Sequence, residues 1–337
     1  MKQFSPKLSN IYIGNSFVDD LHIFLSDFID SEIILITGKK SFTESPYFEM
    51  LQKVLHSLNI TLKIHEKVAS NPSEVEVQSF CKKSNLTKDN ILAIGGGSVI
   101  DFAKLVKNKH DDIDLYVIYT LPGSASIVTP FTVYDNKEFK IGLYDKDIIP
   151  KSAYIPMEIL EGISLELKLI AISDICAHAI ESYLSKESTE ESKKFAVKAL
   201  DYLLNSKPGN MSMNDVISAD ICAGLSERIG LVLFPHAAGH YLTYQFGVTH
   251  GLATMFYLKP YIDYLYTNCD TVSENWINYV NDLYNILFRL GLIKEPSLTA
   301  EEAEKSFTLI ERYMPFSLNN SPVNISKQKY LEFLTKK

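Results

Sequence analysis

The chain has 337 residues, 46% of them apolar, and carries 33 Lys and Arg against 41 Asp and Glu. At roughly 100–200 residues per domain, this length predicts two domains with sizeable buried cores. The apolar content excludes a disordered chain, and the net charge of −8 argues against nucleic acid or an anionic membrane as a partner.

The N-terminal residues and the cysteines indicate in which cellular compartment the protein is expected. Residues 1–10 contain no signal-peptide pattern, and no stretch approaches the roughly 18 apolar residues of a membrane-spanning helix. The four cysteines form no CxxC pair, so we expect reduced thiols and a cytoplasmic protein. They are Cys81, Cys176, Cys222 and Cys269.

Up to about residue 155, short β-branched runs alternate with longer amphipathic segments, which is typical of parallel strands joined by helices. Strands are predicted at 33–37, 91–94 and 115–120, and a helix at 47–58. The runs at 131–134 and 140–144 predict a hairpin, with Asp135 and Asn136 in its turn. We therefore expect an α/β domain over residues 1–155.

Strand patterns stop near residue 159, and helical periodicity follows at 165–183, 191–204 and 212–229. A polar segment, 319–327, precedes a last short helix. These patterns predict an all-helical domain over residues 156–337, joined to the first domain by a linker near 150–156.

A glycine-rich loop follows the predicted strand 91–94 and precedes a segment that can open a helix. Consecutive glycines allow a ligand to approach the backbone, and a helix N-terminus offers N–H groups to a pyrophosphate. A structural turn is the alternative. The residues of this expected phosphate cradle are Gly95, Gly96, Gly97 and Ser98. Asp101 and Lys104 share the next helical face, where they either touch the loop or cofactor or form a surface ion pair.

Two further strand ends are predicted to bind a nicotinamide nucleotide. Thr120 ends the third strand, and Ser124 and Ser126 lie in the loop of small hydroxyl residues that follows. Gly38 and Lys39 end the first strand, where a dinucleotide-binding fold meets the adenosine ribose. Because no acid stands there and cations do, NADP(H) is favoured over NAD(H), unless the lysines simply form a solvated turn.

The second half contains a specific group of metal-binding residue types. Asp174 and His178 are four residues apart, as are His236 and His240, and His250 follows. On a helix, Asp174 and His178 can bind one ion, and a set of one carboxylate and three imidazoles suits Fe2+ or Zn2+. The remaining histidines are expected at the surface: His22, His56, His65 and His110.

Three motifs together resemble the iron-containing (group III) alcohol dehydrogenases over nearly the whole chain. They are GGGSVIDFAK at 95–104, SDICAHAIESYLS at 173–185 and HAAGHYLTYQFGVTHG at 236–251. The resemblance implies an N-terminal Rossmann-like dinucleotide-binding domain and a C-terminal helical metal-binding domain. It also implies four metal ligands: Asp174, His178, His236 and His250. By the same resemblance His240 lies near the nicotinamide and substrate, and Asn71 belongs to the family's recurring Asn-Pro of the nucleotide site.

The resemblance further implies NAD(P)H-linked hydride transfer to a small aldehyde whose oxygen the metal polarises, in a homo-oligomer such as a dimer. The stretches at 188–204 and 241–251 are most similar to the phosphonoacetaldehyde reductase branch, whose aldehyde carries an anion. Arg228 would meet that anion, or else pair with Glu227 or face solvent.

This sequence departs from the family at two places. Residues 123–127, GSASI, stand where the family usually has GTGSE, and Glu227 and Arg228 stand where many relatives have apolar or amide residues. Two alternatives therefore stay open, namely a dehydroquinate-synthase-like cyclase or lyase, and a non-catalytic nucleotide- or metal-binding relative.

Overall fold

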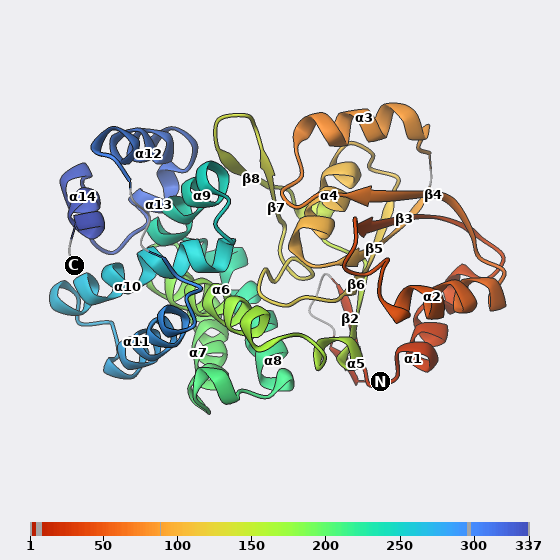
Figure 1. Ribbon diagram of the computed structural model, residues 1–337, viewed down its shortest axis with the longest axis horizontal. Coiled ribbons are helices and arrows are strands. Elements are labelled where there is room, and N and C mark those ends of the chain that lie inside the picture. Colours follow the sequence, from red (N-terminus) through yellow and green to blue (C-terminus); the bar gives the residue numbers. More distant parts are fainter. Residues whose placement is uncertain (1, 5–8, 88, 295–297, 336–337) are drawn as a thin grey trace. The chain divides into compact units, whose positions relative to one another are not determined.

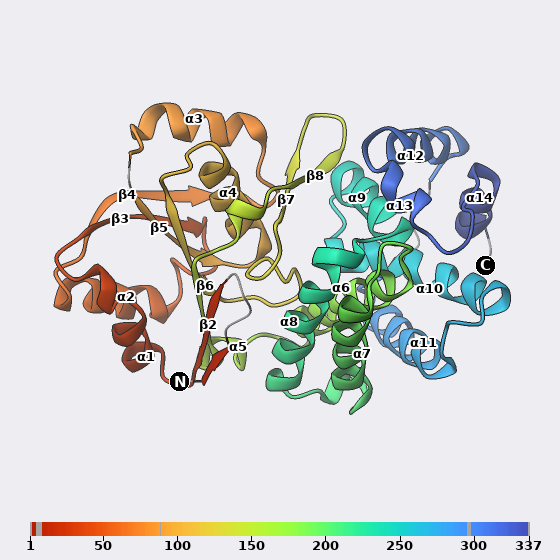
Figure 2. The ribbon, with the colours of Figure 1, turned by 180° about the vertical axis from the view of Figure 1, so that it is seen from behind.

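The computed structural model describes residues 2–4, 9–87, 89–294 and 298–335. It divides the chain into two compact units, drawn from opposite sides in Figures 1 and 2. The sheet unit comprises Met1–Pro122, Ser126–Asn136 and Gly142–Ile163, and the helical unit comprises Gly123–Ala125, Lys137–Ile141 and Ser164–Lys337. The predicted domain boundary at 155/156 stays a prediction.

The sheet unit is built on seven strands in the order β1-β2-β9-β6-β5-β3-β4. β1 is antiparallel to β2, and all other neighbours are parallel. The strands are β1 (Lys2–Phe4), β2 (Asn10–Gly14), β3 (Glu32–Gly38), β4 (Thr61–Val68), β5 (Asn90–Gly95), β6 (Asp114–Tyr119) and β9 (Ser152–Pro156). The predicted α/β class and the strands at β3, β5 and β6 are confirmed.

Helices cover both faces of this sheet, as they must when parallel strands are buried on both sides. Figures 1 and 2 show α1 and α2 on one face and α3 and α4 on the other. The bounds are α1 (Phe17–Phe24), α2 (Pro46–Ser57), α3 (Glu74–Ser84), α4 (Gly97–Asn108) and the short α5 (Met157–Leu160). The predicted hairpin is also confirmed, as β7 (Phe131–Asp135) and β8 (Lys140–Tyr144).

The predicted linker at 150–156 is wrong. Its residues form β9, which is buried throughout and pairs with β2 on one side and β6 on the other. Pro150 precedes the strand and Pro156 ends it, so neither removes a hydrogen bond from the strand's interior. A five-residue strand between two prolines looks like a connecting segment when only the sequence is read.

The helical unit is arranged around α6 (Leu165–Leu184), which packs against α7 (Glu190–Leu204), α8 (Met213–Gly230) and α10 (His250–Asn268). From Leu169 onward nearly every α6 side chain is buried, as expected for a helix without a polar face. The remaining helices are α9 (Phe234–Phe246), α11 (Glu274–Arg289), α12 (Ala300–Tyr313), α13 (Pro315–Asn319) and α14 (Lys327–Thr335). Within the described residues, no helix is both long and apolar enough to cross a membrane.

Lys104 fixes the segment that follows β6 to the helix α4. Its side chain has no exposed surface, and its Nζ donates hydrogen bonds to the carbonyl oxygens of Thr129 (2.8 Å) and Phe131 (2.7 Å). Of the two alternatives for Lys104, the surface ion pair is therefore wrong. The buried ammonium instead joins α4 to the backbone of Thr129 and Phe131, at the start of β7.

We predict that Lys104→Met lowers the free energy of unfolding by about 1–3 kcal/mol, because two buried carbonyls lose a charged donor. Urea unfolding of the full chain measures this loss. Lys53→Met is the matched control, since Lys53 forms an exposed pair with Glu49 and should change stability by less than about 0.5 kcal/mol. Equal effects of the two substitutions would contradict the structural role of Lys104.

Candidate metal centre

The predicted phosphate cradle lies where β5 gives way to α4. Gly96 is the N-cap of α4 and provides no side-chain hydrogen bond to the helix. A Cβ built on Gly95 would lie 2.6 Å from Val99, and one on Gly96 would lie 3.0 Å from Leu121, so only glycine fits this turn. Backbone N–H groups at the N-terminus of α4 can donate hydrogen bonds to a pyrophosphate.

Several predicted cofactor-binding residues lie together at this edge of the sheet. The Thr120 N–H donates to the carbonyl of Gly95 (3.2 Å), and the Asn71 N–H donates to Ser98 Oγ (3.4 Å). Asn71 has φ 58°, a left-handed conformation that asparagine tolerates better than most residues. Because Thr37 pairs with Ile94, Gly38, the last residue of β3, and the exposed Lys39 after it lie at the same edge.

The other predicted nucleotide residues are placed differently. Ser124 groups with the helical unit, and Ser126 is buried in the sheet unit. The backbone carbonyl of Asp101 accepts a hydrogen bond from Thr132 Oγ1 (3.0 Å), which ties α4 to β7. Cofactor binding by these three residues stays a prediction.

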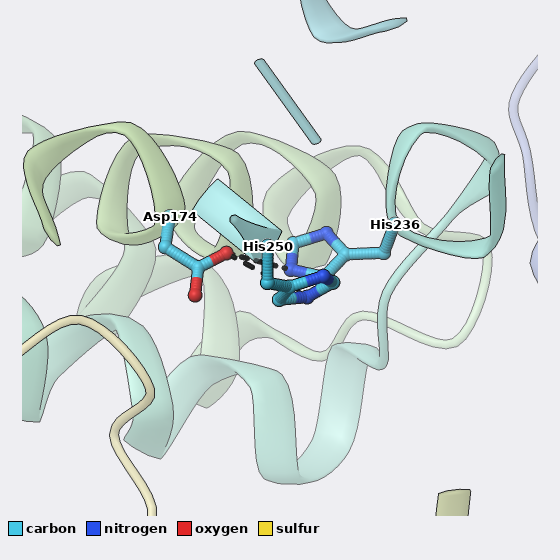
Figure 3. A group of neighbouring side chains, drawn as sticks. All are labelled: Asp174, His236 and His250. Atoms are coloured by element: carbon cyan, nitrogen blue, oxygen red, sulfur yellow. Dashed lines mark ion pairs between the residues drawn. The ribbon is translucent and has the colours of Figure 1, made fainter. Parts of the chain in front are cut away.

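In the helical unit, Asp174, His236 and His250 converge from three helices, as Figure 3 shows. Asp174 lies in α6, His236 in α9, and His250 is the first residue of α10. One ligand atom from each lies within 4.8 Å of the other two. Asp174 Oδ1 is 3.5 Å from His236 Nε2 and 3.8 Å from His250 Nε2.

Two glycines allow these helices to approach so closely. A Cβ on Gly251 would lie 2.4 Å from the carbonyl oxygen of Ile170 in α6, and a Cβ on Gly239 would lie 2.9 Å from Thr254 Oγ1 in α10. Larger residues at either position would separate the helices. Gly251 thus allows His250 to approach Asp174, and Gly239 allows α9 to pack closely against α10.

Within the described residues, Asp174 Oδ1 and His236 Nε2 are buried and have no hydrogen-bond partner. Buried polar atoms are ordinarily satisfied, so each such atom requires an explanation. A divalent cation between one carboxylate and two imidazoles supplies it, and this mixed oxygen and nitrogen set suits Fe2+ or Zn2+. The residues present therefore fit the predicted metal.

Glu181 is a residue of this site to which the sequence analysis assigned no role. Its side chain has no exposed surface, and its two oxygens accept hydrogen bonds from His236 Nδ1 (2.7 Å) and from the Leu233 N–H (2.6 Å). The first bond places the proton on Nδ1 and directs Nε2 toward Asp174. A carboxylate in this position orients and strengthens a metal-binding imidazole.

His240 lies one turn after His236 and is fixed in a similar way. Its Nδ1–H donates to the backbone carbonyl of Lys140 (2.9 Å), and its ring centroid lies 4.9 Å from that of His250. The ring centroid of Phe139 lies 6.3 Å from that of His240. The second nitrogen, Nε2, is therefore the one left for chemistry.

His178 lies beside the group of three. Its ring stacks on His236 with centroids 4.4 Å apart, and its Nε2 is 3.7 Å from Glu227 Oε2. The structure thus places Glu227 at the histidine cluster, while Arg228, the next residue of α8, is partly exposed. Metal binding by His178 and the roles of His240 and Arg228 stay predictions.

Comparisons with known proteins show what the chain is similar to. The sequence model of the family described as "Iron-containing alcohol dehydrogenase" matches residues 9–155. "Alcohol dehydrogenase 4" of Saccharomyces cerevisiae is 24% identical over 307 residues, 83% of this chain and 78% of that protein. The "NADPH-dependent butanol dehydrogenase" of Clostridium saccharobutylicum is 26% identical over 284 residues, 75% of this chain and 71% of that protein.

An iron-containing alcohol dehydrogenase of Thermotoga maritima has the same fold, with a TM-score of 0.80, 24% identity, and coverage of 98% of this chain and 97% of that one. The chain is similar to the iron-containing alcohol dehydrogenases, both in sequence over residues 9–155 and in fold. The resemblance stated from the three motifs is confirmed.

Neighbouring charges and burial divide the histidines of this site into two kinds. Burial alone would lower the pKa of His236, but Glu181 and Asp174 raise it to about 10. Burial lowers the pKa of His178 to about 4 and that of His250 to about 3. A proton on His236 thus supplies positive charge between two carboxylates, and a metal ion entering the site would displace it.

We predict that Glu181→Gln weakens metal binding about 10–100-fold, the usual effect of losing an outer-shell carboxylate. Glutamine has one acceptor for the two donors that Glu181 serves, so His236 or Leu233 must lose its hydrogen bond. Competition with a chelator measures the metal Kd of the full chain.

The matched control is Asp263→Asn, which removes an exposed carboxylate of α10 that pairs with Lys259. This control should bind metal as the unaltered chain does. If Glu181→Gln folds and retains the original affinity, Glu181 does not position His236.

Proposed function

We propose that this protein is a metal-dependent, NAD(P)H-linked alcohol dehydrogenase that acts as an aldehyde reductase on a small substrate. The observation that carries the proposal is the convergence of Asp174, His236 and His250 in a chain whose residues 9–155 match the iron-containing alcohol dehydrogenase model. The names of relatives, alcohol and butanol dehydrogenases, support the same reaction class.

In this proposal Asp174, His236 and His250, with His178 as a fourth residue, hold Fe2+ or Zn2+. When bound, the ion would supply Lewis-acid polarisation of a substrate carbonyl. The chain contributes an oriented imidazole at His236, because Glu181 fixes its tautomer, and a buried carboxylate at Asp174.

His240 is proposed to move the proton that accompanies hydride transfer. Its Nδ1–H is held by the carbonyl of Lys140, so Nε2 is the atom that can accept a proton from an alcohol or return one to the reduced product. Hydride transfer itself is the chemistry of the nicotinamide. The loop of Gly95, Gly96, Gly97 and Ser98 would hold its pyrophosphate.

The proposed substrate is a small aldehyde with an anionic group, such as phosphonoacetaldehyde. Arg228 was the predicted contact for that anion. Lys140 adds support, because its side chain is buried and its charge lowers the pKa values of His240 and His250, although burial is the larger cause. A cation beside these imidazoles favours an anionic substrate over a neutral one.

A cytoplasmic location and a homo-oligomeric state, such as a dimer, are part of the proposal. The location rests on the cysteines, all four of which are free thiols. The oligomer rests on the family resemblance.

We predict that the iron-loaded chain oxidises NADPH or NADH when given a small aldehyde, and that phosphonoacetaldehyde is the best substrate of a panel matched in length. Removing the metal with a chelator, or substituting His250→Ala, should lower kcat at least 100-fold, since each removes the site's polarising charge.

The measurement is anaerobic loss of absorbance at 340 nm with purified full-length protein. Turnover of a substrate without net oxidation of the nucleotide would favour the cyclase or lyase alternative. Binding of metal and nucleotide with no turnover of any kind would favour the non-catalytic one.

A separate prediction concerns the nucleotide. If Lys39 binds a 2′-phosphate, Lys39→Ala should raise the KM for NADPH about tenfold, which corresponds to roughly 1.4 kcal/mol, and should leave the KM for NADH unchanged. Lys53→Ala, an equally exposed lysine of α2, is the control. If the KM for NADPH and the KM for NADH rise equally, Lys39 does not bind a 2′-phosphate.

A further inference from the structure

The loop that follows β6 contains an alanine in an unusual backbone conformation. Ala125 has φ 48°, in the left-handed region, and its side chain has no exposed surface. Where the iron-containing alcohol dehydrogenases usually have GTGSE, this chain has GSASI at 123–127, so Ala125 stands at the position of the second glycine. A Cβ atom makes the left-handed conformation unfavourable, whereas glycine adopts it readily. Other contacts must therefore hold Ala125 in this conformation.

Asp220 supplies one such contact from the middle of α8. The Ala125 N–H donates a hydrogen bond to Asp220 Oδ1 (3.1 Å), and neither residue has exposed surface. A hydrogen bond from a backbone N–H to a carboxylate is stronger than one between neutral groups. A buried carboxylate in turn requires such donors, because it has lost its hydration. The bond thus stabilises the turn at Ala125 and the buried Asp220 together.

Helix α6 fixes the start of the same segment. Gly123 has φ 121°, and a Cβ built on it would lie 3.1 Å from the Cα of Ala171. Ala171, Asp174 and His178 follow one another at spacings of three and four residues, so they share one face of α6. The segment Gly123–Ala125 therefore packs against the α6 face that carries Asp174, and like Asp174 it belongs to the helical unit.

Ser124 lies between these two fixed residues and is one of those predicted to bind the nicotinamide nucleotide. Because α6 holds Gly123 and α8 holds Ala125, the peptide groups on both sides of Ser124 can take few orientations. A loop whose backbone is already ordered loses less conformational entropy when it binds a ligand. The order of this loop therefore contributes to the affinity for whatever it binds.

We infer that Asp220 is a positioning residue of the nicotinamide nucleotide site, which holds Ala125 in its left-handed conformation and thereby orders the loop around Ser124. Asp220 lies outside the three motifs of the sequence, and its separation of 95 residues from Ala125 hides the contact from local patterns. The inference rests on the proposed function, because it assumes that the nucleotide binds at this loop.

The test compares nucleotide binding by Asp220→Ala, by Ala125→Gly and by the double variant. The full chain is loaded with Fe2+ under anaerobic conditions, and the change in nucleotide fluorescence gives the Kd for NADH and for NADPH without turnover. The first substitution removes the acceptor of the Ala125 N–H, and the second removes the Cβ that opposes the left-handed conformation. Asp201→Ala, at an exposed aspartate of α7, is the matched control.

We expect Asp220→Ala to raise the Kd of the preferred nucleotide about tenfold, or roughly 1.4 kcal/mol, because the turn loses a hydrogen bond to a charged acceptor. In the double variant the Kd should return to within about threefold of its original value, since glycine adopts the turn unaided. The nucleotide Kd of the control should not change. Neither should the metal Kd of any variant, measured by competition with a chelator.

An unchanged nucleotide Kd in a folded Asp220→Ala variant overturns the inference, and so does an effect of Asp220→Ala that Ala125→Gly does not reduce. A metal Kd that rises as much as the nucleotide Kd also overturns it, because Asp220 would then only stabilise the helical unit.

Should Asp220→Ala fail to fold, as judged by circular dichroism, Ala125→Val decides in its place. A β-branched residue resists the left-handed region, so this variant should raise the nucleotide Kd at least about tenfold while Asp220 is intact. An unchanged Kd in Ala125→Val overturns the inference.

The proposed function fails separately. If the unaltered chain binds neither NADH nor NADPH, the nicotinamide site itself is contradicted. If the chain binds a nucleotide and oxidises it with an aldehyde, but Asp220→Ala has the same nucleotide Kd, only the role of Asp220 is contradicted.

Discussion

The two hydrogen bonds accepted by Glu181 connect the parts of the helical unit on which the site depends. One bond fixes His236, and the other fixes the Leu233 N–H at the start of α9. Just before it, Leu231 has φ 62°, a backbone conformation that costs about 1–3 kcal/mol for a residue other than glycine. A strained turn of this kind persists only when its surroundings hold it, and Glu181 supplies part of that restraint from the largely buried helix α6.

The candidate metal ligands could be recognised in the sequence because they fall into two local groups. Asp174 and His178 are four residues apart in a strongly helical segment, and the histidines of the 236–251 stretch follow a single motif. The role of Glu181 could not be predicted in this way. It lies on the same helix at i+7 from Asp174, but its two donors are 52 and 55 residues away, and only the folded structure brings them to it.

The features that the sequence analysis placed wrongly, β9 and His65, also depend on partners distant in the chain. β9 is recognisable only through β2 and β6, which pair with it from opposite ends of the first 155 residues. His65, expected at the surface, is partly buried, since its Nε2 lies 3.0 Å from Thr37 Oγ1 and its ring stacks on Phe48. Local periodicity identified the longer helices and the apolar strands correctly, whereas short strands and buried polar contacts depend on partners distant in the chain.

The three side chains proposed to bind the metal differ in their access to solvent. Those of His236 and Asp174 are 3% and 11% exposed, while that of His250 is 24% exposed. His250 is also the first residue of α10, where the helix frays most readily. Exchange of the ion is therefore expected to begin with rotation of this one imidazole. The rate at which the protein acquires or loses its metal would then follow the opening of a single helical turn, independently of how tightly the closed site holds the ion.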